Sequence, residues 1–364
     1  MKNNNTKKVK PENIFIIIGI ILVIMVMISL VLIIYMKQYK NPSNKKLIEA
    51  GIVEKKVKIG DVDFNYAEGP GNGPALLLLH AQTLDWFTYN KVLPVLSEKF
   101  HVFAVDYPGH GKTLCPDDYP MTANQIGNDL ANFIEMVIGE PAYVTGNSSG
   151  GLLTVWLAAN RHDLVKAVVL EDPPLFSSEY PEIKQTIADR LFTASYKAVQ
   201  DKKYSGNFLD YWIENGTEFF KNYTGPFSQQ LIRFAVNNYK KANPGKPVEI
   251  AFLPVSVQEM LRGLNYYNPR FGAAFHEGSW NEGFDHAEAL GKIQCPAVLI
   301  HANFEIMGNG ILNGAMSQEQ ADRAVSLIPY CQYIRIDAGH VTNLETPGRF
   351  IQIIEEIRGT TLQN

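Results

Sequence analysis

Cysteine is scarce in this chain: its 364 residues include only Cys115, Cys295 and Cys331. Three widely spaced cysteines predict neither a disulfide framework nor a zinc site, and each is more typical of a small buried apolar side chain than of a reactive thiol. The His-Glu-x-x-His spacing of a metal site and a Gly-x-Gly-x-x-Gly turn after a strand are also missing from the sequence. We therefore expect neither a metal nor any other cofactor.

Charge is modest as well. Charged residues make up 19% of the chain and the formal net charge is −4, so no basic excess points to a nucleic-acid partner. Hydrophobic residues make up 46%, which over this length is enough for a sizeable buried core. The composition predicts a globular protein.

One segment departs from that composition. Residues 14–36 are 23 uncharged residues, nearly all Ile, Leu, Val or Met, and a helix of this length would span about 34 Å, enough to cross a bilayer. A signal peptide would have a shorter apolar region and a small-x-small cleavage site, but here Met36-Lys37-Gln38-Tyr39-Lys40 follows. We predict an uncleaved transmembrane anchor that contacts the lipid bilayer.

The anchor would follow a basic tail, residues 1–13, and precede a polar, lysine-rich linker, residues 37–52. Lysines flank the span on both sides, so the positive-inside rule nearly cancels. Because one N-terminal span before a globular domain is typical of a signal anchor, we expect a membrane protein whose globular domain lies on the extracytoplasmic side.

Apolar runs of strand length alternate with helical patterns over most of the remaining chain. Alternation of this kind predicts a mostly parallel sheet with helices on both faces. The predicted strands are residues 53–59, 62–66, 75–79, 101–105, 142–145, 165–170, 297–300 and 332–336, and the predicted helices are residues 86–97, 122–138, 152–161, 318–327 and 347–357.

The alternation stops in residues 175–285, which have helical patterns and many aromatic side chains. Part of this aromatic set would form the insertion's own core, and part would line an apolar pocket over the carboxyl edge of the sheet. We therefore predict a core built from residues 53–174 and 286–364 and a helical cap formed by residues 175–285.

The segment Gly146-Asn147-Ser148-Ser149-Gly150 places a serine inside Gly-x-Ser-x-Gly, after a strand pattern and before a helical one. This is the context of a nucleophile elbow. The serine would occupy a strained, very tight turn whose close packing requires the glycines. Ser148 is the predicted nucleophile, and the backbone N–H of Ser149 is a predicted oxyanion donor. The pattern is common by itself, so the rest of the chain must supply a base and an acid.

Three other segments complete a constellation: Leu79-His80-Ala81-Gln82, the run from Asp106 to Thr113, and Asp337-Ala338-Gly339-His340. With the elbow they cover residues ~60–360, and in order and spacing they resemble the α/β-hydrolase family. The resemblance implies an eight-stranded sheet with a helical cap, His340 as the catalytic base and the N–H of Gln82 as the second oxyanion donor. Ala81 departs from the family pattern, which usually has glycine there.

Two carboxylates are candidates for the acid that orients His340. Glu305 follows the strand that ends near His301, where most members of the family place the acid. Asp172 ends the strand at residues 165–170, before Pro173 and Pro174, a position that some relatives use instead. A proline-stiffened loop favours preorganisation, but an aspartate there could also merely cap the turn. Both alternatives stay open.

The predicted function is that of a membrane-anchored serine hydrolase, which cleaves an ester or a related acyl bond, such as a lactone or thioester, of a small apolar substrate. A serine nucleophile excludes the dehalogenase and epoxide-hydrolase reactions that use aspartate. Two alternatives remain: hydrolysis of a C–C bond or perhydrolase chemistry on the same residues, and a non-catalytic receptor or adhesion module with this fold.

Overall fold

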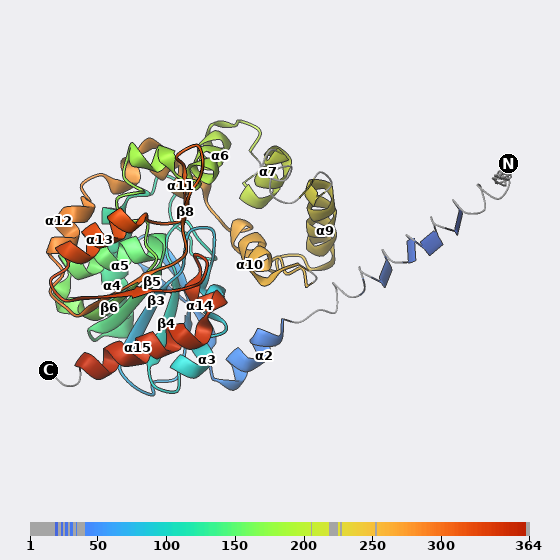
Figure 1. Ribbon diagram of the computed structural model, residues 1–364. Coiled ribbons are helices and arrows are strands. Elements are labelled where there is room, and N and C mark those ends of the chain that lie inside the picture. Colours follow the sequence, from blue (N-terminus) through green and yellow to red (C-terminus); the bar gives the residue numbers. More distant parts are fainter. Residues whose placement is uncertain are drawn as a thin grey trace, which may run out of the picture.

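The architecture is a single large sheet between two layers of helices (Figure 1). The computed structural model describes residues 41–204, 206–217, 225, 228–251 and 253–361, together with scattered residues between 19 and 34. In this part of the chain, eight strands lie in the order β1-β2-β4-β3-β5-β6-β7-β10. The strands are β1 (Val53–Ile59), β2 (Val62–Glu68), β3 (Ala75–Leu79), β4 (His101–Asp106), β5 (Ala142–Asn147), β6 (Val165–Glu171), β7 (Ala297–His301) and β10 (Cys331–Arg335).

The sheet is mostly parallel, as the alternating pattern predicts. Only the pairs β1–β2 and β2–β4 are antiparallel, and every pair from β4 to β10 is parallel. All five residues of β3 are buried, as expected for a strand covered on both faces. The edge strand β1 instead exposes Lys55, Lys56 and Lys58, whose charges oppose pairing with another chain.

Each face of the sheet packs on its own helical layer. Leu77 and Leu79 of β3 join a cluster with residues of α4 (Ala123–Phe133), α5 (Ser149–Asn160), α12 (His286–Gly291) and α13 (Gln318–Leu327). Leu76 and Leu78 point the other way, toward residues of η1 (Trp86–Tyr89), α3 (Leu93–Leu96) and α15 (Pro347–Thr361). Because successive side chains of a strand point to opposite faces, β3 contributes to two hydrophobic cores, one on each face of the sheet.

The insertion between β6 and β7 is helical in its described residues, and Figure 1 shows it along one end of the sheet and to the side. Its aromatic rings pack on one another: Phe275 stacks on Phe192 at 5.0 Å and on Trp280 at 4.3 Å between ring centroids. The elements are η4 (Glu182–Gln185), α6 (Asp189–Gln200), α7 (Phe208–Asn215), α9 (Ser228–Ala242), α10 (Val255–Leu264), α11 (Pro269–Glu277) and η5 (Ser279–Asn281).

Local chemistry moves some predicted boundaries. The helix predicted at residues 86–97 is divided into η1 and α3, because Asp85 caps η1 and the chain turns at Asn90. The segment predicted as a linker contains helix α2 (Pro42–Glu49), which Asn41 caps and whose Leu47 is buried. The long loop after β7 contains a small antiparallel ribbon of β8 (Glu305–Ile306) and β9 (Leu312–Asn313).

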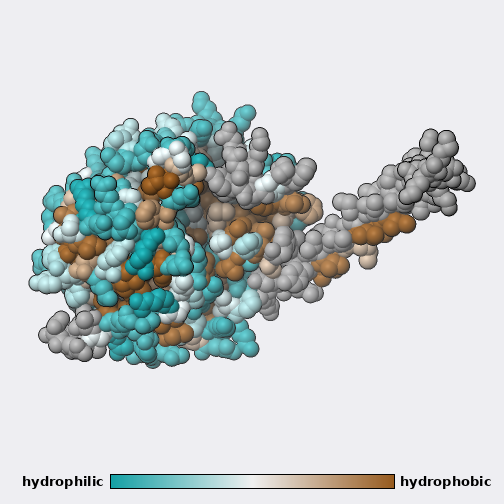
Figure 2. Space-filling view, viewed as in Figure 1, coloured by the Kyte–Doolittle hydropathy of each residue, from teal (hydrophilic) through white to brown (hydrophobic). Residues whose placement is uncertain are grey.

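The predicted anchor falls mostly outside the described residues, as does the basic tail at residues 1–13. Among the residues that are described, no helix has the length and apolar character to cross a membrane. The described positions between 19 and 34 are apolar, and Figure 2 colours them brown, whereas the visible surface of the body is largely hydrophilic.

Candidate active site

Ser148 lies on the sharp turn between β5 and α5, with φ 56° and ψ −120°. Its N–H donates to the carbonyl of Glu171 at 2.9 Å, which ties the turn to the end of β6. A Cβ at Gly146 would overlap the Gly150 carbonyl, and a Cβ at Gly150 would overlap the Leu79 carbonyl. Both positions therefore require glycine, the physical basis of the Gly-x-Ser-x-Gly pattern.

His340 follows β10 in the loop before α14 (Thr342–Glu345), and its Nδ1 lies 2.7 Å from Oδ2 of Asp172. Asp172 is 1% exposed, and its Oδ1 accepts a hydrogen bond from the N–H of Ala302 at 3.1 Å. Since a carboxylate accepts, Nδ1 is the donor in this contact. The Nε2 atom of the neutral ring is then left as a proton acceptor.

The two candidate acids lie in different surroundings. Asp172 ends β6 beside the elbow, where it adopts a left-handed backbone with φ 47°. Glu305 lies in the β8–β9 ribbon, is exposed, and pairs through its backbone with Asn313. The structure therefore brings Asp172 to His340 and leaves Glu305 in the ribbon.

Asn147 joins the three segments that carry Ser148, His340 and Asp172. Its Nδ2 donates to the carbonyl of Glu171 at 3.0 Å and to the carbonyl of His340 at 2.8 Å, and its side chain is buried. The sequence gives no sign of this role, because the second position of Gly-x-Ser-x-Gly is open to any residue type.

The two candidate oxyanion donors lie on loops that Tyr107 connects. Tyr107 Oη donates to the carbonyl of His80 at 3.0 Å and lies 2.8 Å from Ser149 Oγ. Because the phenol has one proton, Ser149 Oγ–H is the donor in the second contact. The loop that begins at His80 also carries Gln82, and Ser149 begins α5, whose first N–H groups have no partner within the helix.

Ser148, Ser149, Gln82 and His340 all line a cavity of about 400 Å³. Its other walls come from the loop between β3 and η1, the segment after β6, the insertion and residues 313–315. They are mainly apolar and include Leu84, Ile183, Ile187, Leu191, Phe192, Met260 and Phe275. In the described part of the chain, no Lys, Arg, Asp or Glu lines this cavity. Its size and character suit a small apolar ligand.

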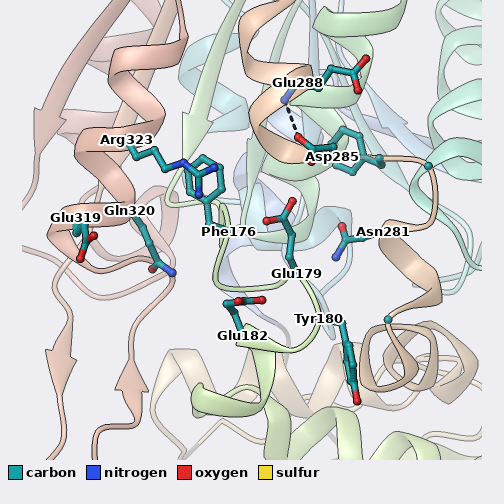
Figure 3. Close-up of a pocket in the computed structure, with 13 residues that line it drawn as sticks. Phe176, Glu179, Tyr180, Glu182, Asn281, Asp285, Glu288, Glu319, Gln320 and Arg323 are labelled. Carbon is teal, nitrogen blue, oxygen red and sulfur yellow. Dashed lines mark hydrogen bonds between the residues drawn. The ribbon is translucent and has the colours of Figure 1, made fainter.

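A second cavity, of about 670 Å³, lies between the insertion and α13 and is strongly polar (Figure 3). Glu179, Glu182 and Asp285 surround it, and the guanidinium of Arg323 lies 4.1 Å from the ring centroid of Phe176. Its described lining includes no serine, threonine, cysteine or histidine. The predicted nucleophile Ser148 and predicted base His340 line only the smaller, apolar cavity of the two.

Glu171, next to Asp172 in the chain, directs its carboxyl group elsewhere. It accepts hydrogen bonds from Thr145 Oγ1 at 2.9 Å, Tyr89 Oη at 3.1 Å and Thr342 Oγ1 at 3.3 Å. Complete burial raises the pKa of Glu171 to about 8. Glu171 is therefore mostly neutral at pH 7, and it braces the loop of His340 without adding a second negative charge beside Asp172.

Metal-ligating side chains are not gathered anywhere in the part of the chain that the structure describes: no group of three or more His, Cys, Asp or Glu could hold an ion there.

Comparison with known sequences assigns the family of this chain. The profile of the α/β-hydrolase family matches residues 76–353. The chain belongs to this family, as the four motifs predicted. The match begins within β3 and spans the later strands, the elbow, the insertion and the loop of His340; β1 and β2 precede it.

Known relatives share the fold but differ in activity. The chain is 33% identical over 123 residues to 2-(acetamidomethylene)succinate hydrolase of Mesorhizobium japonicum, covering 33% of this chain and 42% of the relative. It is 24% identical over 318 residues to bifunctional epoxide hydrolase 2 of Rattus norvegicus, covering 81% and 53%. The chain thus spans about half the length, or less, of these curated relatives.

Solved structures match over nearly the whole chain. A membrane phospholipase A described as a bacterial virulence factor aligns with TM-score 0.62 and 18% identity, covering 96% of this chain and 99% of that one. A carboxylesterase of Bacillus subtilis aligns with TM-score 0.58 and 18% identity, covering 86% and 95%. At these identities the similarity establishes the fold.

The pKa of Glu171 predicts a pH-dependent stability. Between its usual pKa of 4.5 and the folded value of about 8, the unfolded chain loses this proton and the folded chain keeps it. Stability contributed by the neutral group is therefore complete below pH 4.5 and is lost as the pH rises toward 8, by up to ~1.4 kcal/mol per pH unit. Glu171→Gln, which imitates the neutral acid, should remove this loss. Denaturant unfolding at pH 5 and pH 7 measures it.

The matched control is Glu305→Gln, at an exposed glutamate. Its free energy of unfolding should change between pH 5 and pH 7 as that of the wild type does. An equally steep loss in Glu171→Gln and in the wild type would show that the Glu171 carboxyl is ionised in the folded protein.

Proposed function

We propose that this protein is a serine hydrolase that cleaves a carboxylic ester, or a related acyl bond such as a lactone or thioester, of an uncharged apolar substrate. The observation that carries the proposal is the 2.7 Å contact between His340 Nδ1 and buried Asp172, at a cavity that Ser148 also lines. This arrangement orients an imidazole and leaves its second nitrogen as a base, the requirement of a nucleophilic serine.

The reaction divides into acylation and deacylation. His340 Nε2 takes the hydroxyl proton of Ser148 as Oγ attacks the substrate carbonyl, and Asp172 stabilises the resulting imidazolium. The N–H groups of Ser149 and Gln82 hold the oxyanion, an interaction typically worth ~3 kcal/mol per donor. His340 then gives its proton to the leaving alcohol. Water attacks the acyl-enzyme by the same route and releases the acid and Ser148.

The cavity supports an uncharged substrate. A carboxylate or phosphate in it would lose its hydration without gaining a cationic partner, because no Lys or Arg is found among the described lining residues. Ile183, Leu191, Phe192 and Met260 instead offer apolar contact to an acyl or aromatic group.

A second candidate is C–C bond hydrolysis. One relative, 32% identical over 126 residues, is named 2-hydroxy-6-oxo-6-(2'-aminophenyl)hexa-2,4-dienoic acid hydrolase and comes from Metapseudomonas resinovorans. The substrate in that name carries a carboxylic acid, for which the described lining of this cavity has no cationic partner. Ester cleavage is therefore the favoured reaction. A perhydrolase would use the same residues, and a non-catalytic receptor would need none of them.

Ser148, His340 and Asp172 form the proposed catalytic triad, and substitution of any of them should nearly abolish ester hydrolysis. Ser148→Ala removes the nucleophile and His340→Ala removes the base, so each should lower kcat by ~10⁴-fold or more. Asp172→Asn leaves the imidazole without its orienting carboxylate and should lower kcat by at least ~10³-fold. A fluorophosphonate probe should label wild-type Ser148 and leave Ser148→Ala unlabelled.

The matched control for the acid is Glu305→Gln, which should keep kcat within about twofold of wild type. Loss of activity in Glu305→Gln with full activity in Asp172→Asn would make Glu305 the acid. Full activity in both variants would disprove the triad, and a wild type that the probe does not label would favour the non-catalytic receptor.

The charge of the substrate should strongly affect kcat/KM for ester hydrolysis. A short uncharged p-nitrophenyl ester should exceed the ester of the same length with a terminal carboxylate by at least ~10-fold in kcat/KM, since the carboxylate would be buried without a partner. Initial rates with both esters measure the ratio.

A β-diketone tested beside these esters separates the two hydrolytic candidates. Ester hydrolysis should be the faster reaction. Faster cleavage of the diketone, or a preference for the anionic ester, would transfer the proposal to C–C bond hydrolysis.

The proposed location is a membrane, with residues 14–36 as a single-pass anchor and the catalytic domain on the extracytoplasmic side. Support comes from the described part of this segment, where every large hydrophobic side chain is at least half exposed: Ile20, Val23, Ile24, Val26, Met27, Leu30, Val31 and Ile34. Such a row of exposed apolar side chains suits lipid.

The full chain should therefore stay with the membrane fraction after carbonate extraction. Ile24→Arg with Val31→Arg should release it, because each arginine costs ~3 kcal/mol at the centre of a span. Ile24→Leu with Val31→Leu is the control and should remain bound. Release of the wild type would disprove the anchor, and labelling of Ser148 in intact cells by a membrane-impermeant fluorophosphonate tests the orientation.

A further inference from the structure

Helix α10 of the insertion touches the backbone of the loop that carries Gln82. A Cβ on Gly263 would overlap the carbonyl oxygen of Thr83 and lie 2.7 Å from Cα of Leu84. Only a residue without a side chain permits this approach. The helix therefore rests directly on the loop between β3 and η1, with no side chain between the two backbones.

Thr83 itself is in an unfavourable conformation. It is a buried, β-branched residue with φ 63°, a region that such residues rarely adopt. Its Oγ1 donates to the carbonyl of Gln82 at 2.6 Å, which sets the orientation of that peptide group. Strained conformations persist only where the surroundings hold them, and Gly263 is part of those surroundings.

An ion pair fastens the far end of the same loop to α10. Arg262 Nε donates to Asp85 Oδ2 at 2.8 Å, and both side chains are buried. Asp85 Oδ1 in turn accepts from the N–H of Phe87 and so caps η1. The Arg262 guanidinium also lies 4.2 Å from the ring centroid of Phe87. Arg262 Nη1 also donates to Glu249 Oε1 at 3.0 Å. Removing Arg262 would leave the buried carboxylate of Asp85 without its cation, so the contact resists opening.

Tyr267, in the turn between α10 and α11, contacts Gln82 directly. Gln82 Nε2 donates to Tyr267 Oη at 2.5 Å, across 185 positions of sequence, and the tyrosine ring is buried. The described residues of α10 and of this turn thus hold the loop at Gln82, at Thr83 and at Asp85.

We propose that Tyr267, Gly263 and Arg262 are positioning residues that hold the Gln82 N–H where an oxyanion can reach it. This inference rests on the proposed serine-hydrolase function. The insertion then has two roles. Ser256 and Met260 of α10 line the cavity. The next turn of the same helix keeps the loop between β3 and η1, which carries Gln82, in its strained conformation. We call Tyr267, Gly263 and Arg262 the clamp. The clamp acts on the transition state rather than on the bound substrate, because the Gln82 N–H stabilises the substrate's carbonyl oxygen most strongly once that oxygen carries a negative charge.

The decisive variant is Tyr267→Phe, which keeps the buried ring and removes only the hydroxyl. It should lower kcat for an uncharged p-nitrophenyl ester by roughly 10- to 100-fold and leave KM within about threefold. Gly263→Ala, which pushes on Thr83 and Leu84, should act in the same direction.

An inhibitor pair distinguishes positioning from general damage. Ser148 Oγ adds to the carbonyl of an alkyl trifluoromethyl ketone, its proton passes to His340, and the ketone oxygen becomes an oxyanion in the hole. The matching methyl ketone binds without forming much of this adduct. Tyr267→Phe should therefore weaken binding of the fluorinated ketone at least ~10-fold and leave that of the methyl ketone unchanged.

Matched controls are available at distant positions. Tyr119→Phe removes an equally buried hydroxyl that donates to Asp129, and Gly291→Ala adds a Cβ with no atom within 4 Å. Both should keep wild-type kcat and wild-type affinity for the fluorinated ketone. Thermal unfolding of each variant measures any loss of stability separately.

Two failures have different meanings. If the wild type hydrolyses esters and Tyr267→Phe keeps its kcat and its affinity for the fluorinated ketone within twofold, or weakens both ketones equally, the clamp is disproved and the proposed function stands. A wild type that neither hydrolyses esters nor binds the fluorinated ketone disproves the proposed function and the clamp together.

Discussion

The close approach of backbones at the elbow is the constraint on which the rest of the site depends. Gly150 packs against the end of β3, Gly146 packs against Gly150, and the turn between them puts Ser148 at φ 56°. A side chain at either glycine would push the start of α5 away from β5 or from the end of β3. The same turn is hydrogen-bonded to the end of β6 and, through Asn147, to the loop of His340. One packed junction thus aligns three loops from distant parts of the chain.

Two neighbouring carboxyl groups, Glu171 and Asp172, are both buried, and their different hydrogen-bond partners give them different roles. Glu171 turns into the core, where hydroxyl groups surround it and burial raises its pKa to about 8. Asp172 turns toward His340 and is held by the N–H of Ala302. The environment separates a structural acid from the one beside the imidazole, a familiar arrangement in enzymes that use paired carboxyls.

The insertion contributes more than a wall to the apolar cavity. It contacts the loop after β3 through Gly263, Arg262 and Tyr267, so the part of the chain that would select the substrate also packs on the part that would stabilise the oxyanion. A buried ion pair is a costly way to join two segments. This ion pair therefore fits a role in positioning the loop after β3 and not in stability alone.

The sequence alone determined the alternation of strands and helices, the elbow and the family, because these follow from local periodicity and from glycines that the turn requires. It left Asp172 and Glu305 as alternatives with a slight preference for Asp172, and it did not reveal the contacts that Asn147, Tyr107 and Tyr267 make. The choice between the two carboxylates and the parts played by these three residues depend on contacts between distant segments, such as that between residues 172 and 340, which are 168 positions apart. Only the tertiary structure decided them, because the packing of the sheet, and no local pattern, brings the ends of β3, β6 and β10 to one edge.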